Sequence, residues 1–524
     1  MNKKNFRVFF KNVLCLAVSV VIFPMLFTSC DTVEKPQTTD GDSDIVFHDD
    51  GSVTQMVNVA NPILAGYQAD PSAYKFGGAY YIYSTTDGYV LNGNAGWPMI
   101  WKSYDFVNWE AKPMEIVNSK GYKFTDAQSY FWAPSMLHWN DTYYLFFTQG
   151  DYFTMVAESD SPEGPFTVLG NLFGTTNATR PKNKTIDAQA FLDDDGKAYL
   201  VYLLRENDTQ GDAALYTAIC ELDPDNLTKV KHIEKIEELS HSYREGQEIL
   251  KRDGKYYMLY SEGSWMNDTY HVKYAMADSI YGPYTVKETI LSSPGDHKIV
   301  GTGHHSTIKD GDRYIMVYHR QGIPFLGFGF RQVCADEMIF NDDGTIMPVT
   351  ATYEGIKVPY KMSREEYELS NVAKGAEVTV NDVFERKYGP DLLVDGDNST
   401  LWKSKDREGD KVLTIDLKGT YSIARTEICF EYASKFYYYK IETSEDGENW
   451  TLYADHTEDK TKESPRIDKA EGSFVTAGYL RLTITGSESM ARNYGSKNSA
   501  EPERWKEPAR IGIFEFRVMG KESK

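Results

Sequence analysis

Five segments of the chain share one pattern, in which a polar turn leads into a strand of alternating aromatic or aliphatic residues. The segments are Gly77–Tyr83, Asn140–Phe146, Asp195–Val201, Asp253–Leu259 and Gly311–Val317. Their strands begin at Tyr80, Tyr143, Ala198, Tyr256 and Tyr314, which are nearly evenly spaced. Each interval is long enough for about four strands with their turns, the size of one propeller blade. The pattern therefore predicts an all-β fold that begins with a five-bladed β-propeller over residues 55–358.

Ten or eleven positions before these strands, four of the five repeats carry an ionisable residue. These residues are Asp70, Asp187, Glu245 and His304, and the second repeat has Ala133 beside Trp132. If the repeated strand is the second of its blade, the earlier residues lie on the innermost strand. The innermost strands line the axis of a propeller. We therefore expect these side chains to converge on one axial pocket.

Three carboxylates in an aromatic-walled pocket suit the hydrolysis of a glycosidic bond. One carboxyl must stay ionised to activate water, and another must stay protonated to protonate the leaving oxygen. Burial and crowding by like charges push the pKa values of such groups apart. A third carboxylate can hold the pKa of the acid high. The pattern thus indicates a glycosidase.

The pattern changes after Pro359. Residues 359–374 are charged and weakly periodic, which predicts a linker. Alternating strands with Asp-Gly turns follow, and their most distinctive segments are Leu393–Trp402, Thr443–Trp450, Tyr479–Ile484 and Ile511–Val518. They predict a β-sandwich of jelly-roll type over residues 375–521.

The segment 1–29 combines a basic start, an apolar stretch and a small residue directly before Cys30. This arrangement resembles a bacterial lipoprotein signal peptide, in which Cys30 is the lipidated residue. The polar residues 30–54 then predict a flexible tether. The resemblance implies a lipid-anchored protein of the bacterial cell envelope, facing the periplasm or the outer-membrane surface. Membrane contact is expected through this anchor only.

The net charge of −21 argues against a nucleic-acid partner, because a phosphate backbone would be repelled. The chain is rich in aromatic residues, with 37 Tyr, 26 Phe and 9 Trp, which favours strands and surfaces that stack on sugars. Cys220, Cys334 and Cys429 are too few for a disulfide framework, so we expect small buried hydrophobes. The protein is expected to be a monomer.

Several motifs resemble those of glycoside hydrolase family 43, in the order that family has them. They are Ala69–Ser72, Trp132–Pro134, Ile186–Ala188, Glu245-Gly246 and Gly301–Ser306. The resemblance implies a five-bladed propeller and inverting hydrolysis without a required cofactor. By position, Asp70 resembles the general base, Asp187 the residue that modulates the pKa of the acid, and Glu245 the general acid. For substrate binding, Trp132 resembles an aromatic wall, His304 an axial histidine and Arg331 a sugar-contacting arginine.

The second domain resembles the discoidin fold (coagulation factor 5/8 type C), similar to carbohydrate-binding module family 32. Members often hold one structural calcium ion, and Asp395, Thr400 and Glu515 match positions that commonly ligate it. Oxygen ligands of this kind suit calcium. Glycan binding by this domain is left open.

The family resemblance implies an enzyme acting on a plant-type oligosaccharide or polysaccharide, as an α-L-arabinofuranosidase or β-D-xylosidase. A galactose-directed member, either an exo-β-1,3-galactosidase or a β-galactofuranosidase, is the alternative, because Ser135 stands where an acidic residue is more usual. A non-catalytic surface glycan-binding lipoprotein is the alternative from another class. The three carboxylates weigh against it, since a pure binder has no need to crowd them.

Overall fold

The computed structural model describes residues 45–88, 96–119, 131–150, 153–173, 183–207, 213–295, 298–323, 329–488 and 510–523. Residues 45–524 form one compact unit. Among the described residues, no helix has both the length and the apolar character needed to span a bilayer. The predicted signal peptide and Cys30 lie outside the described residues.

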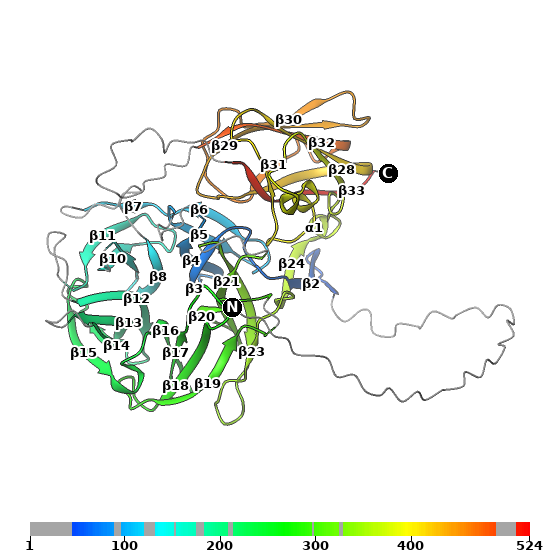
Figure 1. The fold of residues 1–524 in the computed structure, drawn as a ribbon. Coiled ribbons are helices and arrows are strands. Elements are labelled where there is room, and N and C mark those ends of the chain that lie inside the picture. The colour runs from blue at the N-terminus through cyan, green and yellow to red at the C-terminus, as the bar shows by residue number, and fades with distance from the viewer. Residues whose placement is uncertain are drawn as a thin grey trace, which may run out of the picture. The chain divides into compact units, whose positions relative to one another are not determined.

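Five sheets are arranged around one axis (Figure 1). The first is β3 (Gln68–Phe76), β4 (Ala79–Thr86), β5 (Met99–Ser103) and β6 (Glu110–Pro113). The second is β8 (Trp132–Trp139), β9 (Thr142–Gln149), β10 (Phe153–Ser159) and β11 (Phe166–Asn171), joined by the parallel strand β7 (Ile116–Val117). The third is β12 (Asn183–Leu192), β13 (Ala198–Asn207), β14 (Ala213–Leu222) and β15 (Val230–Ile236), followed by the 3-10 helix η1 (Glu237–Leu239).

The fourth sheet is β16 (Glu245–Arg252), β17 (Lys255–Glu262), β18 (His271–Ala277) and β19 (Thr285–Ser292), joined by β23 (Val349–Thr350). The fifth is β20 (Gly303–Asp310), β21 (Arg313–Gln321) and β22 (Arg331–Met338). The five-bladed propeller is confirmed. The repeated strands are β4, β9, β13, β17 and β21, each the second of its sheet as the repeat predicted.

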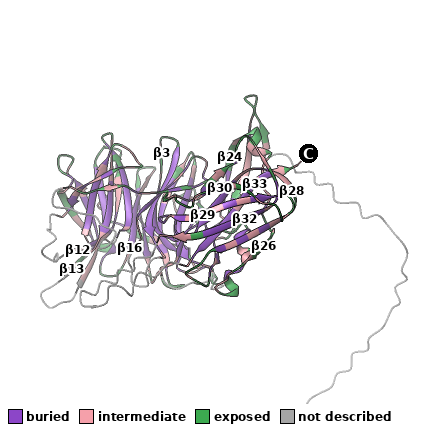
Figure 2. Ribbon diagram, turned by 90° about the horizontal axis from the view of Figure 1, so that it is seen from above, coloured by how far each residue is buried: buried purple, intermediate pink, exposed green. Residues whose placement is uncertain are grey.

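The hydrophobic core of the propeller lies between neighbouring blades. For example, one cluster packs Tyr81 and Tyr83 of β4 against Leu145 and Phe147 of β9. Further clusters join the second blade to the third, the third to the fourth, the fourth to the fifth, and the fifth to the first. Because both faces of a blade are covered, its inner strands are almost entirely buried, whereas the outer strands and the turns carry exposed residues (Figure 2). This explains why the repeated strands are so rich in aromatic residues.

The short strands β1 (Ile45–Phe47) and β2 (Ser52–Val59) form a separate sheet with β24 (Ile356–Ser363). β2 pairs antiparallel with β24 from Ser52 opposite Ser363 to Val59 opposite Ile356. The structure thus differs from the expected flexible tether at residues 45–54 and from the expected linker at 359–363. β2 precedes all five blades in the sequence and β24 follows them, so neither segment carries a local signal of its pairing. The helix α1 (Arg364–Tyr367) follows directly.

The second domain is one nine-stranded sheet system wrapped around its own core. Its strands are β25 (Ser370–Asn371), β26 (Glu377–Val380), β27 (Trp402–Lys403), β28 (Lys411–Phe430), β29 (Tyr437–Ser444), β30 (Thr451–Asp455), β31 (Arg466–Lys469), β32 (Val475–Ser487) and β33 (Gly512–Glu522). The 3-10 helices η2 (Arg386–Tyr388) and η3 (Pro390–Leu393) precede β27. Trp402 and Phe516 are fully buried in this core. The predicted β-sandwich is confirmed.

Buried contacts join the sandwich to the propeller. Tyr67 of the propeller packs in one cluster with Tyr432 and Phe514 of the sandwich. The Tyr432 hydroxyl donates a 3.0 Å hydrogen bond to the carbonyl oxygen of Gly88. Cys429 also lies in this cluster, and it is buried and free, as are Cys220 and Cys334. The cysteines are therefore small buried hydrophobes, as predicted.

Candidate active site

Each innermost strand is interrupted by a β-bulge at the same place. Pairing with the second strand breaks between Ala69 and Ser72, Trp132 and Ser135, Ile186 and Gln189, Glu245 and Glu248, and Gly303 and Ser306. The first unpaired residue of every bulge is left-handed: Asp70 (φ 50°), Ala133 (42°), Asp187 (57°), Gly246 (58°) and His304 (45°). Bulges of this kind re-aim side chains and are frequent beside active sites. The predicted convergence on the axis is thus confirmed, and the bulges produce it.

Glu245 does not occupy the same register position as the other axial residues. The bulge position of the fourth blade is taken by Gly246, and Glu245 lies one residue earlier, at the position of Trp132 in the second blade. A Cβ atom at position 246 would lie 2.9 Å from Cγ of His304. Only glycine leaves room for the histidine at this left-handed position. The Glu245 carboxyl therefore approaches the axis from the residue directly before the bulge.

The backbone amides at the bulges are satisfied by the neighbouring blades. The amide of Ala133 donates to Thr85 Oγ1 at 2.9 Å, and that of Asp187 donates to Thr148 Oγ1 at 3.2 Å. In the same way His304 donates to Ser261 Oγ at 2.9 Å, and Asp70 donates to His319 Nδ1 at 3.1 Å. In the third blade the position of these acceptors is taken by Leu203, whose side chain cannot accept a hydrogen bond. The amide of the next bulge, at Gly246, donates to the Asp187 carboxylate instead. The ring of acceptors holds all five bulges in place.

Asp70 is surrounded by hydrogen-bond donors. Its Oδ1 lies 2.8 Å from Nη1 of Arg331 and 3.1 Å from Nδ1 of His304. Its Oδ2 accepts a 2.7 Å hydrogen bond from the Thr85 hydroxyl. Burial by itself would raise the pKa of Asp70, but the charge of Arg331 outweighs it, and the pKa is held well below its usual value. Asp70 is therefore ionised over the whole working range of pH.

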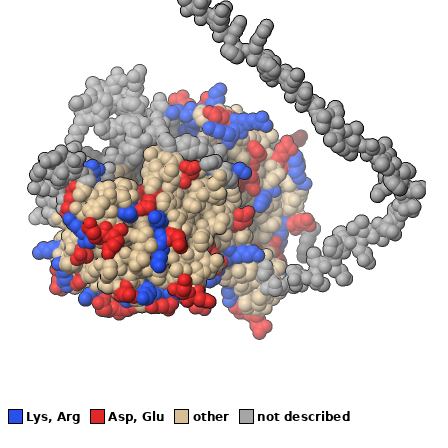
Figure 3. Space-filling view, turned by 60° about the horizontal axis from the view of Figure 1, so that its bottom comes forward, with Lys and Arg blue, Asp and Glu red and all other residues tan. Residues whose placement is uncertain are grey.

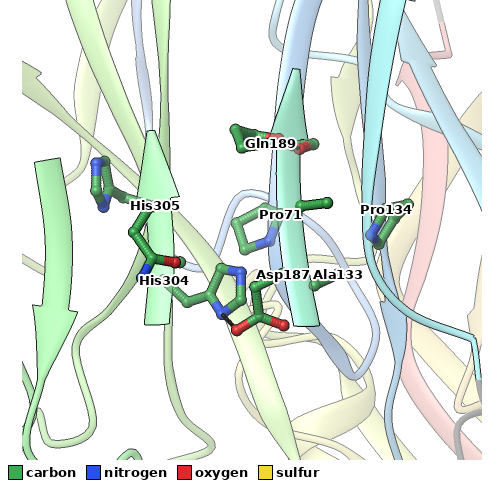
Figure 4. A pocket seen from close by; sticks show the side chains of 11 residues that line it. Pro71, Ala133, Pro134, Asp187, Gln189, His304 and His305 are labelled. Carbon is green, nitrogen blue, oxygen red and sulfur yellow. Dashed lines mark hydrogen bonds and ion pairs between the residues drawn. The ribbon is translucent and has the colours of Figure 1, made fainter. Parts of the chain in front are cut away.

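Asp187 has the opposite electrostatic environment. Burial, followed by the charges of Glu245 and Asp70, raises its pKa well above the usual value. His304 is close to it, with Nδ1 3.9 Å from Asp187 Oδ2 (Figure 4). Burial lowers the pKa of that histidine, so the imidazole is neutral and does not offset the crowded negative charge. The axial site thus pushes the pKa values of two neighbouring carboxyls apart, lowering that of Asp70 and raising that of Asp187.

Glu245 is only 8% exposed, and two tyrosines hold its carboxylate. Tyr270 donates to Oε1 at 2.8 Å and Tyr243 donates to Oε2 at 2.7 Å. The nearby Glu248 points elsewhere, because its two oxygens accept the amide and hydroxyl of Thr307 on β20. Glu248 is therefore engaged by β20, and Glu245 is the carboxyl held by the two tyrosines.

Arg331 is clamped between two aspartates. Besides Asp70, it contacts Asp87, which accepts from Nε at 2.9 Å and from Nη2 at 3.2 Å. The guanidinium also lies 4.6 Å from the ring centre of Trp265. The structure thus places the predicted arginine in the site, where it orients Asp70, and its contact with a sugar remains a prediction. Trp132 is partly exposed at the start of β8, beside the bulge, and its role as an aromatic wall also remains a prediction.

A small cavity lies on the axis against Asp187 and His304. It is lined by residues from all five innermost strands, and Figure 4 shows Asp187 and His304 pointing toward one another across it. His305, the next residue of β20, points away from them on the far side of the strand. Of the predicted axial residues, Ala133, Asp187 and His304 line this cavity, and Asp70 joins them through its contact with His304.

The sandwich brings together the three residues expected to hold calcium. Thr400 Oγ1 donates to Asp395 Oδ2 at 2.7 Å, and Glu515 Oε1 accepts the amide of Gly396 at 2.6 Å. Glu515 is fully buried, and its Oε2 accepts no hydrogen bond among the described residues. Burial, together with Asp395, raises its pKa to about 7. Two crowded carboxyls and a hydroxyl form a set of oxygen ligands that fits a hard cation, and Nε of Arg517 lies 3.8 Å from Oε2 of Glu515.

Axial carboxyls whose pKa values are pushed apart, on a five-bladed propeller, are the arrangement expected of a glycoside hydrolase. Residues 59–346 match the family model "Glycosyl hydrolases family 43", so the chain belongs to that family. Its members act with inversion and need no cofactor. Residues 377–498 match the F5/8 type C domain, which confirms the discoidin-like assignment.

Known proteins resemble the chain over different lengths. A β-D-galactofuranosidase of Aspergillus niger is 32% identical over 321 residues, which are 58% of this chain and 89% of that protein. An arabinoxylan arabinofuranohydrolase of Paenibacillus polymyxa is 25% identical over 380 residues, 66% of this chain and 57% of that protein. A solved glycoside hydrolase superposes with a TM-score of 0.70 at 26% identity, covering 88% of this chain and all of that one.

Sequence reasoning missed several residues of the site, among them Thr85, Asp87, Tyr243, Tyr270 and His319. Two of them carried a readable signal. Thr85 and His319 both stand five positions after the first residue of the repeated strand, where Thr148 and Ser261 stand in other blades. A polar residue at this place in four of five buried strands identifies the ring of acceptors. Asp87 and Tyr270 lie in segments after β4 and before β18 that do not repeat, and had no such signal.

Proposed function

We propose that the protein is an exo-acting α-L-arabinofuranosidase that removes terminal or side-chain arabinofuranose from plant polysaccharide such as arabinoxylan. The observation that carries the proposal is that Arg331 holds Asp70 as an ionised base while a second axial carboxyl, Glu245, is held separately by Tyr270 and Tyr243. Inverting hydrolysis needs a base and an acid on two different carboxyls. An arabinoxylan-directed relative and the wider family support the choice of sugar.

In this proposal Asp70 is the general base. It takes a proton from a water molecule that attacks the anomeric carbon, while Glu245 protonates the departing glycosidic oxygen. Asp187 is the third carboxyl beside Glu245, and burial, followed by the charges of Glu245 and Asp70, raises its pKa. Arg331 and His304 hold Asp70 in its ionised form.

A β-D-galactofuranosidase is the second candidate. The relative from Aspergillus niger supports it, because this chain matches 89% of its length. The two sugars have the same ring configuration, and galactofuranose differs by a longer substituent on C4. A pocket for one therefore fits the reacting atoms of the other, and the space around C4 decides between them.

Hydrolysis of four 4-nitrophenyl glycosides tests the proposal: α-L-arabinofuranoside, β-D-galactofuranoside, β-D-xyloside and β-D-galactoside. We expect the highest kcat/KM on the arabinofuranoside, and none of this activity in Asp70→Ala. Preference for galactofuranoside would establish the second candidate. Preference for a pyranoside, either xyloside or galactoside, would contradict both furanoside proposals.

We propose further that the protein is anchored to the cell envelope through lipidated Cys30, and that the sandwich binds calcium through Asp395, Thr400 and Glu515. Among the described surface residues, the face in Figure 3 mixes acidic and basic side chains without a basic tract. This fits the net charge of −21 and a neutral glycan as partner. Metabolic labelling with a fatty acid, compared between the wild type and Cys30→Ser, tests the anchor.

A further inference from the structure

The two oxygens of Glu245 lie in different surroundings. Oε1 accepts from Tyr270, which is fully buried, and Oε2 accepts from Tyr243, whose side chain is 48% exposed. Tyr243 lies two positions before Glu245, between η1 and β16. Oε2 therefore faces the accessible side of the pocket and Oε1 faces the interior.

Tyr270 is held rigidly in place. Its ring stacks on that of His319 at 5.7 Å, with the two planes within 9° of each other. A Cβ atom at Gly303 would lie 2.4 Å from the same ring, so the glycine is what makes room for it. A shift of the phenol away from Glu245 would break this packing.

A hydrogen-bond relay fixes the direction of the proton between Tyr270 and Glu245. The amide of His304 donates to Ser261 Oγ. Because that oxygen is the acceptor there, the Ser261 hydroxyl proton is available to donate to the Tyr270 phenol, which it contacts. The Tyr270 proton is then directed to Oε1 of Glu245 at 2.8 Å. A carboxyl oxygen onto which a proton is fixed in this way is the carbonyl oxygen of the acid form, whereas the Tyr243 hydroxyl at Oε2 can turn so that its oxygen accepts.

We propose that Tyr270 is a positioning residue that keeps Oε1 of Glu245 as the carbonyl oxygen, so that the catalytic proton is delivered from Oε2. In the acid form the Tyr243 oxygen accepts the proton of Oε2 as a hydrogen bond, in the place of the leaving-group oxygen, until substrate displaces it. When the bond between the anomeric carbon and the leaving oxygen breaks, its electron pair goes to that oxygen, which takes the proton from Oε2. The resulting carboxylate then accepts a hydrogen bond from the Tyr243 hydroxyl at Oε2. The inference rests on the proposed role of Glu245 as the acid.

The test compares leaving groups, because proton donation matters most when the leaving group is poor. A series of aryl glycosides with leaving-group pKa values from low to high is made on the sugar that the wild type hydrolyses best. For Tyr270→Phe we expect a loss in kcat of about 10²-fold on the poorest leaving groups and little change on 4-nitrophenyl glycosides. The plot of log kcat against leaving-group pKa therefore becomes steeper. For Tyr243→Phe we expect the wild-type slope.

Tyr274→Phe is the matched control. Tyr274 is a buried tyrosine of β18, the strand that begins directly after Tyr270, and its hydroxyl accepts the amide of Ile346, away from the pocket. It should keep the wild-type slope. A uniform loss over the series in Tyr270→Phe would show a purely structural role and overturn the proposal. A steeper slope in Tyr243→Phe would assign the proton to Oε1 instead, and this result is decisive even if Tyr270→Phe does not fold.

A flat series in the wild type would have a different meaning. Rates that do not depend on the leaving group, together with full activity in Glu245→Gln on the poorest leaving groups, would remove Glu245 as the acid. The proposed function would then fail at that residue. The Tyr270 proposal alone fails when Glu245→Gln shows the steep slope and Tyr270→Phe does not.

Discussion

The Thr85 hydroxyl performs two tasks in the site, and replacing it by valine removes both without changing the volume of the side chain. It donates to Oδ2 of Asp70 at 2.7 Å and accepts the amide of Ala133 at 2.9 Å. Thr85 is 1% exposed, so water cannot replace either bond. Thr148 is an equally buried threonine that performs only the second task, for the amide of Asp187.

The structure sets the size of each effect. An unsatisfied buried amide costs about 1–3 kcal/mol, and a hydrogen bond to a charged group contributes about 1.5–3 kcal/mol. We therefore expect Thr148→Val to destabilise the protein by about 2 kcal/mol and Thr85→Val by about 4 kcal/mol. Oδ1 of Asp70 already accepts from Arg331 and lies near His304, so Oδ2 is the oxygen open to the attacking water. Losing the bond that orients Oδ2 should lower kcat by about tenfold or more, which is about 1.4 kcal/mol of barrier.

Urea unfolding and kcat on the preferred 4-nitrophenyl glycoside measure the two effects on the same samples. Both variants should unfold at lower urea than the wild type, Thr85→Val at the lowest concentration. Only Thr85→Val should lose kcat strongly. Equal kcat in the two variants would refute the view that Thr85 orients Asp70. Equal stability would refute the claim that the Thr85 hydroxyl makes one stabilising hydrogen bond more than that of Thr148.

Three further predictions concern charge, metal and the domain contact. Asp187 has a raised pKa, so its folded state is penalised as pH rises above the ordinary value of 3.8; Asp187→Asn should raise the melting temperature at pH 7 while it lowers kcat. The pKa of Glu515 is raised, so protein treated with EDTA should lose stability as pH rises from the ordinary value of 4.5 to about 7. Added calcium should restore this stability. Glu515→Gln should show neither the loss with pH nor the gain with calcium. Tyr432→Phe removes the hydrogen bond to Gly88 and should cost about 1 kcal/mol in thermal unfolding, with a few-fold loss of kcat because Gly88 follows Asp87.

The repeat in the sequence predicted the blades because each blade buries both faces and needs the same aromatic strand. It also predicted the axial residues, because the distance from the bulge to the second strand varies little between blades. The same spacing could not show that Glu245 lies one residue before the bulge position of its strand. The separation of Glu245 from Tyr256 equals that of Asp187 from Ala198, yet Asp187 lies in a bulge and Glu245 beside one.

Features that depend on distant partners could not be predicted. β2 pairs with β24 across the whole sequence of the propeller, so residues 45–54 looked like a tether. Asp87 is positioned by Arg331, and Tyr270 by Gly303 and His319, and no short motif links these residues. Local patterns encode strands and turns, whereas the partners of a buried charge emerge only when the blades close around the axis.

The most direct test of the account is the anomeric configuration of the first sugar released. Proton NMR during the first turnovers of 4-nitrophenyl α-L-arabinofuranoside distinguishes the two anomers before they equilibrate. A base at Asp70 that acts through water predicts β-L-arabinofuranose as the first product, and loss of that signal in Asp70→Asn. The α-anomer as first product would contradict the account, because it would require a carboxylate that attacks the sugar directly.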